Sequence, residues 1–169
     1  MSGSYVDYKE DIREYIKKRY SEDSTVLDVG AGSGTYRKLL DGYIMDAVEI
    51  WEPNIERYSL RDIYRNVFNE DIRGFKYDWY DLVIFGDVLE HLEVEEAKEV
   101  LRYAYEHSKE VIVAVPYEYK QGEEEGNIYE IHKQDDLTPE TMKERYPELK
   151  EYIRNDRYGY YVKYNNTVL

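Results

Sequence analysis

A short apolar segment near the middle of the chain constrains the fold more than any other. Residues 82–85, Leu-Val-Ile-Phe, form a continuous apolar run between Asp81 and Gly86. Because every position is apolar, rather than every second one, the run is typical of a strand that is covered on both faces. Such strands belong to parallel sheets that carry helices on both sides, so this segment predicts an α/β architecture.

Strand-like and helix-like segments alternate along the rest of the chain. Apolar runs predict further strands, and amphipathic or well-capped segments predict helices between them. The last two predicted strands, 148–155 and 158–165, are separated only by Asp156 and Arg157, so we expect them to pair as an antiparallel hairpin. The predicted strands are 24–30, 45–50, 63–68, 80–86, 110–116, 148–155 and 158–165, and the predicted helices are 5–20, 35–40, 94–105 and a segment that begins at Thr138 and Pro139.

This order of segments predicts one α/β domain built on a Rossmann-like, doubly wound sheet. The sheet is expected to be mostly parallel, because helices connect its first strands, and to end in the antiparallel hairpin. No repeat and no linker divides residues 1–169, so a single domain is expected. In sheets of this kind, ligands bind at the carboxyl ends of the strands, where the winding reverses.

A glycine-rich turn follows the first predicted strand. Gly30, Gly32 and Gly34 allow a sharp turn into a helix and let a ligand lie against bare backbone. The spacing is not the G-x-G-x-x-G of dinucleotide-binding loops, because position 35 is threonine. Asp28 stands directly before the turn, where a carboxylate suits a cationic ligand group better than a pyrophosphate.

Further acids stand at the ends of the next predicted strands. Glu49 closes the second strand, Asp71 follows the third and Asp87 follows the fourth. A carboxylate at the second position can accept two hydrogen bonds from a ribose diol. The acids and the glycine turn are therefore expected to meet at one edge of the sheet.

Together these features resemble the class I S-adenosylmethionine-dependent methyltransferases. VLDVGAGSG (residues 26–34) is similar to the glycine-rich first motif of that family, and Glu49 and Asp71 match its second-strand acid and its adenine-contacting acid. YDLVIFGDVLEHL (80–92) and IHKQDDLTPETM (131–142) resemble the subgroup that includes the ubiquinone and menaquinone biosynthesis methyltransferases. The resemblance implies a seven-stranded sheet whose last strand is antiparallel.

The resemblance runs from about Thr25 to Tyr164 and implies S-adenosylmethionine as the cofactor. Asp28 would orient the methionyl end near its ammonium group, Glu49 would hold the ribose hydroxyls, and Asp71 would contact the adenine amino group. The implied cofactor-binding residues are Asp28, Gly30, Ala31, Gly32, Gly34, Glu49, Ile50, Trp51, Asp71, Ile72, Gly86 and Asp87, with Ile50 and Ile72 on the ring faces and Trp51 as a lid or a packing residue.

Two other segments are expected to shape the pocket. Residues 1–22 would cover the cofactor with their helix, and residues 117–136 would form a loop on the substrate side. This 117–136 loop is polar, acidic and interrupted by glycine, which is typical of an excursion over a sheet edge.

Three histidines are candidates for the chemistry. Methyl transfer needs an aligned nucleophile, and it needs a base only when the nucleophile carries a proton that must leave. His132, in the 117–136 loop, and His91, after the fourth strand, are both expected near the transferred methyl group. His107 ends a helix and is expected to be a structural helix-end residue. No metal ligand set is predicted.

Composition limits the substrates and the compartment. The formal net charge of −14 disfavours a nucleic-acid substrate, and the absence of cysteine removes disulfides and thiolate nucleophiles. The N-terminal segment is too charged for a secretory signal, and no apolar run is long enough to cross a membrane, so a cytoplasmic protein without membrane insertion is expected. The acceptor is expected to be a small molecule, a sugar or a lipid-like compound, and a protein side chain stays open.

Two alternative functions stay open at this point. A nicotinamide-dependent Rossmann oxidoreductase would share the fold class and Glu49, although Asp28 and the shortened glycine spacing disfavour it. A catalytically degenerate protein would bind the cofactor and act as a regulatory or interaction partner, since the intact acids bear on binding and not on turnover.

Overall fold

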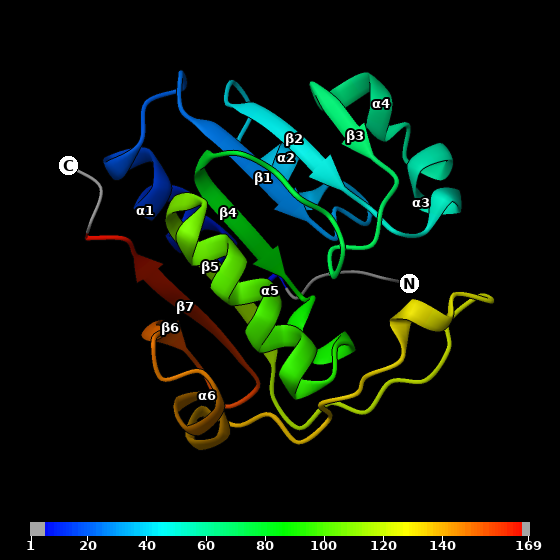
Figure 1. Cartoon of the computed structure of the whole chain (residues 1–169), viewed down its shortest axis with the longest axis vertical. Helices are drawn as coiled ribbons and strands as arrows, with labels where there is room; N and C mark the ends of the chain where they lie inside the picture. Colours follow the sequence, from blue (N-terminus) through cyan, green and yellow to red (C-terminus); the bar gives the residue numbers. More distant parts are fainter. Residues whose placement is uncertain (1–5, 167–169) are drawn as a thin grey trace.

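A computed structural model describes residues 6–166 of the chain. Its strands form one seven-stranded sheet in the order β3-β2-β1-β4-β5-β7-β6 (Figure 1). The first five strands pair in parallel, and β7 pairs antiparallel with both β5 and β6. The strands are β1 Thr25–Val29, β2 Ile44–Val48, β3 Asn66–Phe68, β4 Tyr80–Gly86, β5 Ser108–Pro116, β6 Lys150–Arg154 and β7 Tyr158–Tyr164.

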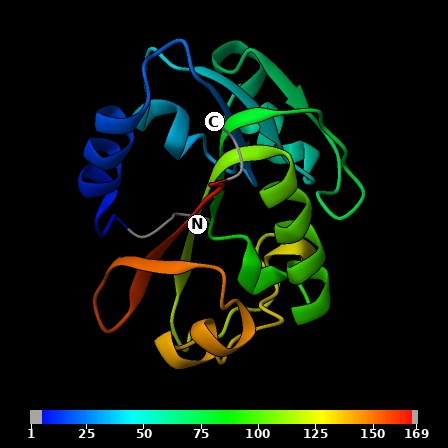
Figure 2. The same ribbon diagram turned by 60° about the vertical axis from the view of Figure 1, so that its left-hand side comes forward.

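Helices cover both faces of the sheet. Figure 2 shows α1 and α5 on opposite sides of it. One apolar core packs α5 and α6 against one face of the sheet. A second core packs α1, α2, α3 and α4 against the other face. The helices are α1 Lys9–Arg19, α2 Thr35–Leu39, α3 Glu52–Arg57, α4 Leu60–Ile63, α5 Val94–Glu106 and α6 Pro139–Arg145, with short 3-10 turns η1 Leu89–His91 and η2 Ile128–Glu130. The expected doubly wound fold with an antiparallel C-terminal hairpin is confirmed.

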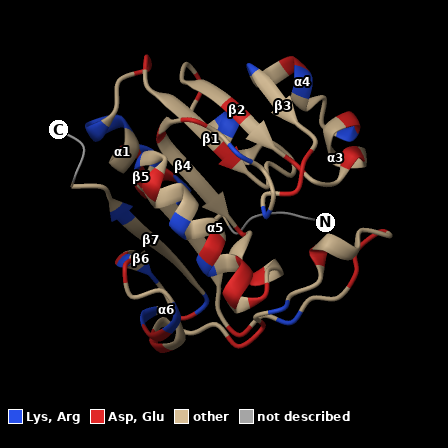
Figure 3. Ribbon diagram, viewed as in Figure 1, with Lys and Arg blue, Asp and Glu red and all other residues tan. Residues whose placement is uncertain are grey.

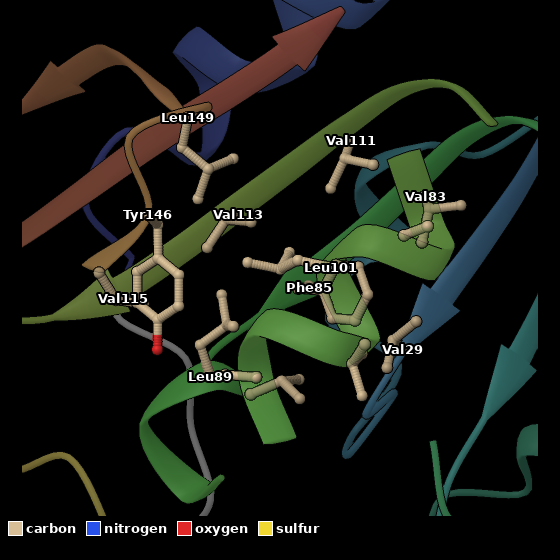
Figure 4. Close-up of a cluster of buried hydrophobic side chains, with 14 of the residues drawn as sticks. Val29, Val83, Phe85, Leu89, Leu101, Val111, Val113, Val115, Tyr146 and Leu149 are labelled. Atoms are coloured by element: carbon tan, nitrogen blue, oxygen red, sulfur yellow. The ribbon is translucent and has the colours of Figure 1, made fainter. Parts of the chain in front are cut away.

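The central strands alternate their side chains between the two cores. Val83 and Phe85 pack with Leu101 of α5 in the first core (Figure 4), whereas Leu82 and Ile84 lie in the second. All five are at most 1% exposed. This double burial explains the continuous apolar run in β4, because neither of its faces meets water.

Element bounds differ from the sequence expectation at a few places. The third strand is shorter than predicted, because Ile63 completes α4 and pairing with β2 begins only at Asn66. The predicted first helix begins at Lys9 rather than Tyr5, and Tyr5 lies outside the described residues. The short helices α3 and α4 were not predicted, since each has only one or two turns and so little periodicity.

One close contact fixes the end of β4. A Cβ atom on Gly86 would lie 2.1 Å from Cε2 of Tyr36. The Tyr36 ring is buried, and its hydroxyl meets Lys9 Nζ at 3.0 Å and the Tyr160 hydroxyl at 2.9 Å. The Tyr36 ring therefore cannot move to relieve a clash with an added Cβ atom.

Replacing Gly86 with alanine is therefore expected to destabilise the fold by about 1–3 kcal/mol through overpacking. Urea unfolding followed by circular dichroism measures this loss. Gly122→Ala is the matched control, because no atom lies within 4 Å of the added Cβ, and it should change stability by less than about 0.5 kcal/mol. Equal stabilities of the two variants would contradict the packing argument.

Candidate active site

A cavity of about 540 Å³ opens at the carboxyl ends of the parallel strands. Its walls include the residues that follow β1, β2 and β4, together with Pro116 at the end of β5. The position is the one where the sheet reverses its winding between β1 and β4. The volume lies in the range of ordinary small-ligand pockets, about 300–1,000 Å³.

The glycine turn forms one wall of this cavity. Gly30, Ala31 and Gly32 line it, and Gly32 has a positive φ of 52°. The Gly32 N–H donates a 2.8 Å hydrogen bond to Oε2 of Glu49, which ties the turn after β1 to the end of β2. No side chain stands at position 32, so a ligand can approach the backbone there.

Glu49 is held in place by backbone donors. Its Oε1 accepts the N–H of Trp51 at 2.9 Å while its Oε2 accepts that of Gly32. Burial raises the pKa of Glu49, and these hydrogen bonds oppose the rise. A carboxylate has about four lone-pair sites, so Glu49 can still accept a hydrogen bond from a hydroxyl in the cavity.

Asp28 lies beneath the site and does not line the cavity. Its side chain is buried, and its Oδ2 accepts a hydrogen bond from the hydroxyl of Tyr64. Burial raises the pKa of Asp28 to about 7, although the Tyr64 hydrogen bond opposes the shift. Asp28 therefore lies behind the cavity wall, with Tyr64 as its hydrogen-bond partner.

The raised pKa makes stability depend on pH. Because the folded pKa of about 7 exceeds the usual 3.8, Asp28 contributes stability that is lost as pH rises from about 4 to 7. Asp28→Asn removes this loss, so the stability of the variant relative to the original chain should increase between pH 5 and pH 8. Urea unfolding at both values measures the difference, and a difference that does not change with pH would contradict the burial argument.

The wall after β3 carries a second acid. Asp71 and Ile72 line the cavity together with Arg73. Arg73 pairs with Asp71 at 2.6 Å and with Glu96 of α5 at 3.0 Å, and hydrogen bonds from Arg73 lower the pKa of Asp71 despite the opposing effect of its partial burial. Figure 3 shows acidic positions at the start of α5 and along the segment that follows β3.

Most of the other predicted cofactor residues meet at the same cavity. Ile50, Gly86 and Asp87 line it. Besides Asp28, two predicted residues do not line it: Gly34 is the N-cap of α2, and Trp51 precedes α3 and donates its backbone N–H to Glu49.

The 117–136 loop forms a further wall of the cavity. Lining residues come from both of its arms, among them Tyr119, Gln121, Ile131 and His132. The N–H of Lys133 donates a 2.7 Å hydrogen bond to the Glu90 carbonyl, which fastens the loop to η1. The loop thus lines the cavity, and its contact with a substrate stays a prediction.

His91 and His132 lie together at this end. Their ring centroids are 4.7 Å apart, and both residues line the cavity. Burial is the largest cause that lowers both pKa values, that of His91 to about 4, so both rings are neutral at pH 7. His107 lies elsewhere, stacked on Tyr103 at 3.9 Å, as expected for a structural residue.

Sequence reasoning missed two charged residues of the site. Glu90 is 1% exposed and lines the cavity beside His91, and Arg73 engages Asp71. The sequence DVLEHL carries a local signal for Glu90, because this acid stands directly before the candidate histidine His91. Nothing local marks Arg73, because its role depends on α5 lying beside it.

The expected cover by residues 1–22 is not seen in the part of that segment that the structure describes. No residue of α1 lines the cavity. Instead Lys9 donates hydrogen bonds to the hydroxyls of Tyr36 and Tyr160, and Tyr158 beside them donates to Asp87 Oδ2 at 3.1 Å. Within the described residues, α1 thus supports the cavity floor, and residues 1–5 lie outside the description.

Comparison with known proteins agrees with this geometry. Residues 27–110, just under half of the chain, match the family Methyltransf_11, described as a methyltransferase domain. No curated protein matches the chain. Within residues 6–166, which the structure describes, no helix has the length and apolar character needed to cross a lipid bilayer.

Solved structures share the fold at low sequence identity. An S-adenosylmethionine-dependent methyltransferase from Clostridium acetobutylicum ATCC 824 is 12% identical with a TM-score of 0.69, over 95% of this chain and 92% of that one. Magnesium protoporphyrin IX methyltransferase (ChlM) from Synechocystis PCC 6803, with bound SAM, is 14% identical with a TM-score of 0.64, over 92% and 77%. The N-terminal domain of EvdMO1, with SAH bound, is 14% identical with a TM-score of 0.68, over 96% and 83%.

The fold is therefore that of S-adenosylmethionine-dependent methyltransferases, and residues 27–110 are similar to a methyltransferase domain. Two of these structures of the same fold carry S-adenosylmethionine or S-adenosylhomocysteine, the cofactor expected from the sequence and its product.

Proposed function

We propose that the chain transfers the methyl group of S-adenosylmethionine to a small-molecule, sugar or lipid-like acceptor. The observation that carries this proposal is one continuous cavity lined by two different groups of residues. The glycine turn and Glu49, which follow β1 and end β2, line the part that we call its cofactor end, and Glu90, His91 and His132, which follow β4 and β5, line the part that we call its acceptor end. A cofactor and an acceptor can therefore meet within one cavity.

The first end suits a nucleoside with a cationic tail. Glu49 has lone pairs left for ribose hydroxyls, and Ile50 and Ile72 offer apolar surface to an adenine ring. Asp87 supplies negative charge for the ammonium and sulfonium groups, and the buried carboxyl of Asp28 lies behind the cavity wall. The carboxylate of Asp71 is already engaged by Arg73, so its contact with an adenine amino group requires Arg73 to release one oxygen.

The second end suits the acceptor. The acceptor lone pair forms a bond to the methyl carbon while the carbon–sulfur bond breaks, and the bonding pair goes to sulfur, which yields S-adenosylhomocysteine. His132 Nδ1 lies 2.6 Å from the Tyr119 carbonyl and donates to it, so Nε2 of the neutral ring carries the lone pair. An acceptor proton can therefore pass to His132 Nε2, with His91 as the alternative base.

A methylation screen tests this proposal. The purified chain is incubated with labelled S-adenosylmethionine and a metabolite extract, and transfer of label to small molecules is the expected result. Binding of S-adenosylhomocysteine without any transfer, across both metabolite and protein acceptors, would instead support the catalytically degenerate alternative.

A further inference from the structure

The acceptor end of the cavity carries a three-residue group with the composition of a metal site. Glu90, His91 and His132 each offer one ligand atom, and the three atoms lie within 4.8 Å of one another. Ligands of one transition ion lie about 2.0–2.2 Å from it and so roughly 3–3.5 Å apart. Small rotations of these side chains would therefore bring the three atoms onto one ion.

One of the two imidazoles already has the orientation of a metal ligand. Metal-binding histidines commonly donate their other ring N–H to a carbonyl, which fixes the orientation of the ring. His132 has this arrangement, because Nδ1 donates to the Tyr119 carbonyl and Nε2 is left for a ligand.

Unsatisfied polar atoms point to the same place. Glu90 Oε2 and His91 Nδ1 are buried and have no hydrogen-bond partner. A buried carboxyl oxygen without a partner is unfavourable by about 1–3 kcal/mol. A cation bound there would give the buried Glu90 oxygen a partner.

We propose that Glu90, His91 and His132 form a binding site for a divalent first-row transition ion. Two imidazole nitrogens and one carboxylate suit Zn²⁺, Fe²⁺, Co²⁺ or Mn²⁺, whereas Mg²⁺ and Ca²⁺ prefer oxygen ligands. Three protein ligands leave further coordination positions open, as in catalytic rather than structural metal sites.

The open positions have a consequence that rests on the proposed function. They face the acceptor end of the cavity, so the ion would hold a hydroxyl oxygen of the acceptor and make its proton easier to remove. A hydroxyl-bearing acceptor is then favoured over an amine. In that state His132 would hold the ion, and the proton of the acceptor hydroxyl would pass to solvent water in the open cavity.

Titration of the untagged full chain with Zn²⁺ tests the site without any cofactor or acceptor. Calorimetry is expected to show one ion bound per chain, and Co²⁺ should give visible absorption bands typical of mixed nitrogen and oxygen ligands. Mg²⁺ at equal concentration should not displace either ion. Absence of stoichiometric Zn²⁺ and Co²⁺ binding would overturn the proposal.

Variants assign the binding to these residues. His91→Ala, His132→Ala and Glu90→Gln should each weaken Zn²⁺ binding at least about 10-fold, whereas His107→Ala, on a helix end away from the cavity, should not change it. Circular dichroism shows whether each variant is folded. His132→Ala is less at risk of unfolding than Glu90→Gln, because the His132 side chain is more exposed than that of Glu90. Folded variants that bind Zn²⁺ as the original chain does would reject the site.

S-adenosylhomocysteine binding separates this proposal from the proposed function. A chain that binds this nucleoside and no Zn²⁺ keeps the methyltransferase proposal and loses the metal site. A chain that binds Zn²⁺ through these residues but does not bind the nucleoside keeps the metal site and loses the methyltransferase proposal.

Discussion

Replacement of His132 by alanine is expected to lower methyl-transfer turnover by about 10²–10⁴-fold while S-adenosylhomocysteine affinity changes little. The side chain lines the cavity from the 117–136 loop and not from the glycine turn, so it can act on the acceptor without holding the cofactor. Steady-state kinetics with an acceptor from the screen, together with calorimetry for the nucleoside, measure the two effects separately.

The pH profile of turnover distinguishes a base from a packing residue. Because burial lowers the pKa of His132 below its usual 6.5, activity should rise with pH along a limb below 6.5, as the ring loses its proton. This limb should disappear in His132→Ala. His107→Ala is the control and should keep both turnover and profile. Full activity in His132→Ala would remove this residue from the mechanism and leave His91 as the candidate.

Replacement of Glu49 by alanine is expected to weaken S-adenosylhomocysteine binding by about 1.5–3 kcal/mol, or roughly 10- to 150-fold in Kd. The variant loses the proposed ribose hydrogen bonds and also the acceptor for the N–H groups of Gly32 and Trp51. Calorimetric titration at one pH and salt concentration measures the change.

Two further variants control this experiment. Glu52→Ala removes an exposed acid three residues away that does not line the cavity, and its affinity should match that of the original chain. Glu49→Gln keeps the size of the side chain and one carbonyl acceptor, so it should lose affinity to a smaller extent. Unchanged affinity in folded Glu49→Ala would place the ribose elsewhere.

The arrangement of the sheet could be predicted because its signals are local. The continuous apolar run of β4 reflects burial on both faces, and the glycines after β1 mark the turn into α2. Short elements such as α3 and α4 escaped prediction, because one turn of helix carries too few residues for a 3.6-residue period to show.

The candidate site was predictable where it follows strand ends and not where it depends on packing between distant segments. Glu49 and Asp87 end or follow buried strands, so topology alone brings them to the cavity. The contact of Glu90 with the 117–136 loop depends on how that loop folds back on η1, through the hydrogen bond from the Lys133 N–H. No periodicity in the sequence records such a contact.

The position of Asp28 near the end of β1 could be predicted, but its hydrogen-bond partner could not. Its place at the end of β1 is as expected, but its side chain turns toward Tyr64, which comes from the end of α4. The sequence could not reveal this partner, because α4 itself was not predictable.

The central claim is that this cavity binds S-adenosylmethionine and not a nicotinamide dinucleotide. Calorimetric titration of the purified chain with S-adenosylhomocysteine and, separately, with NAD tests it most directly. We expect one molecule of S-adenosylhomocysteine bound per chain, weakened by Glu49→Ala, and no heat of binding from NAD. Binding of NAD together with no binding of S-adenosylhomocysteine would contradict the account.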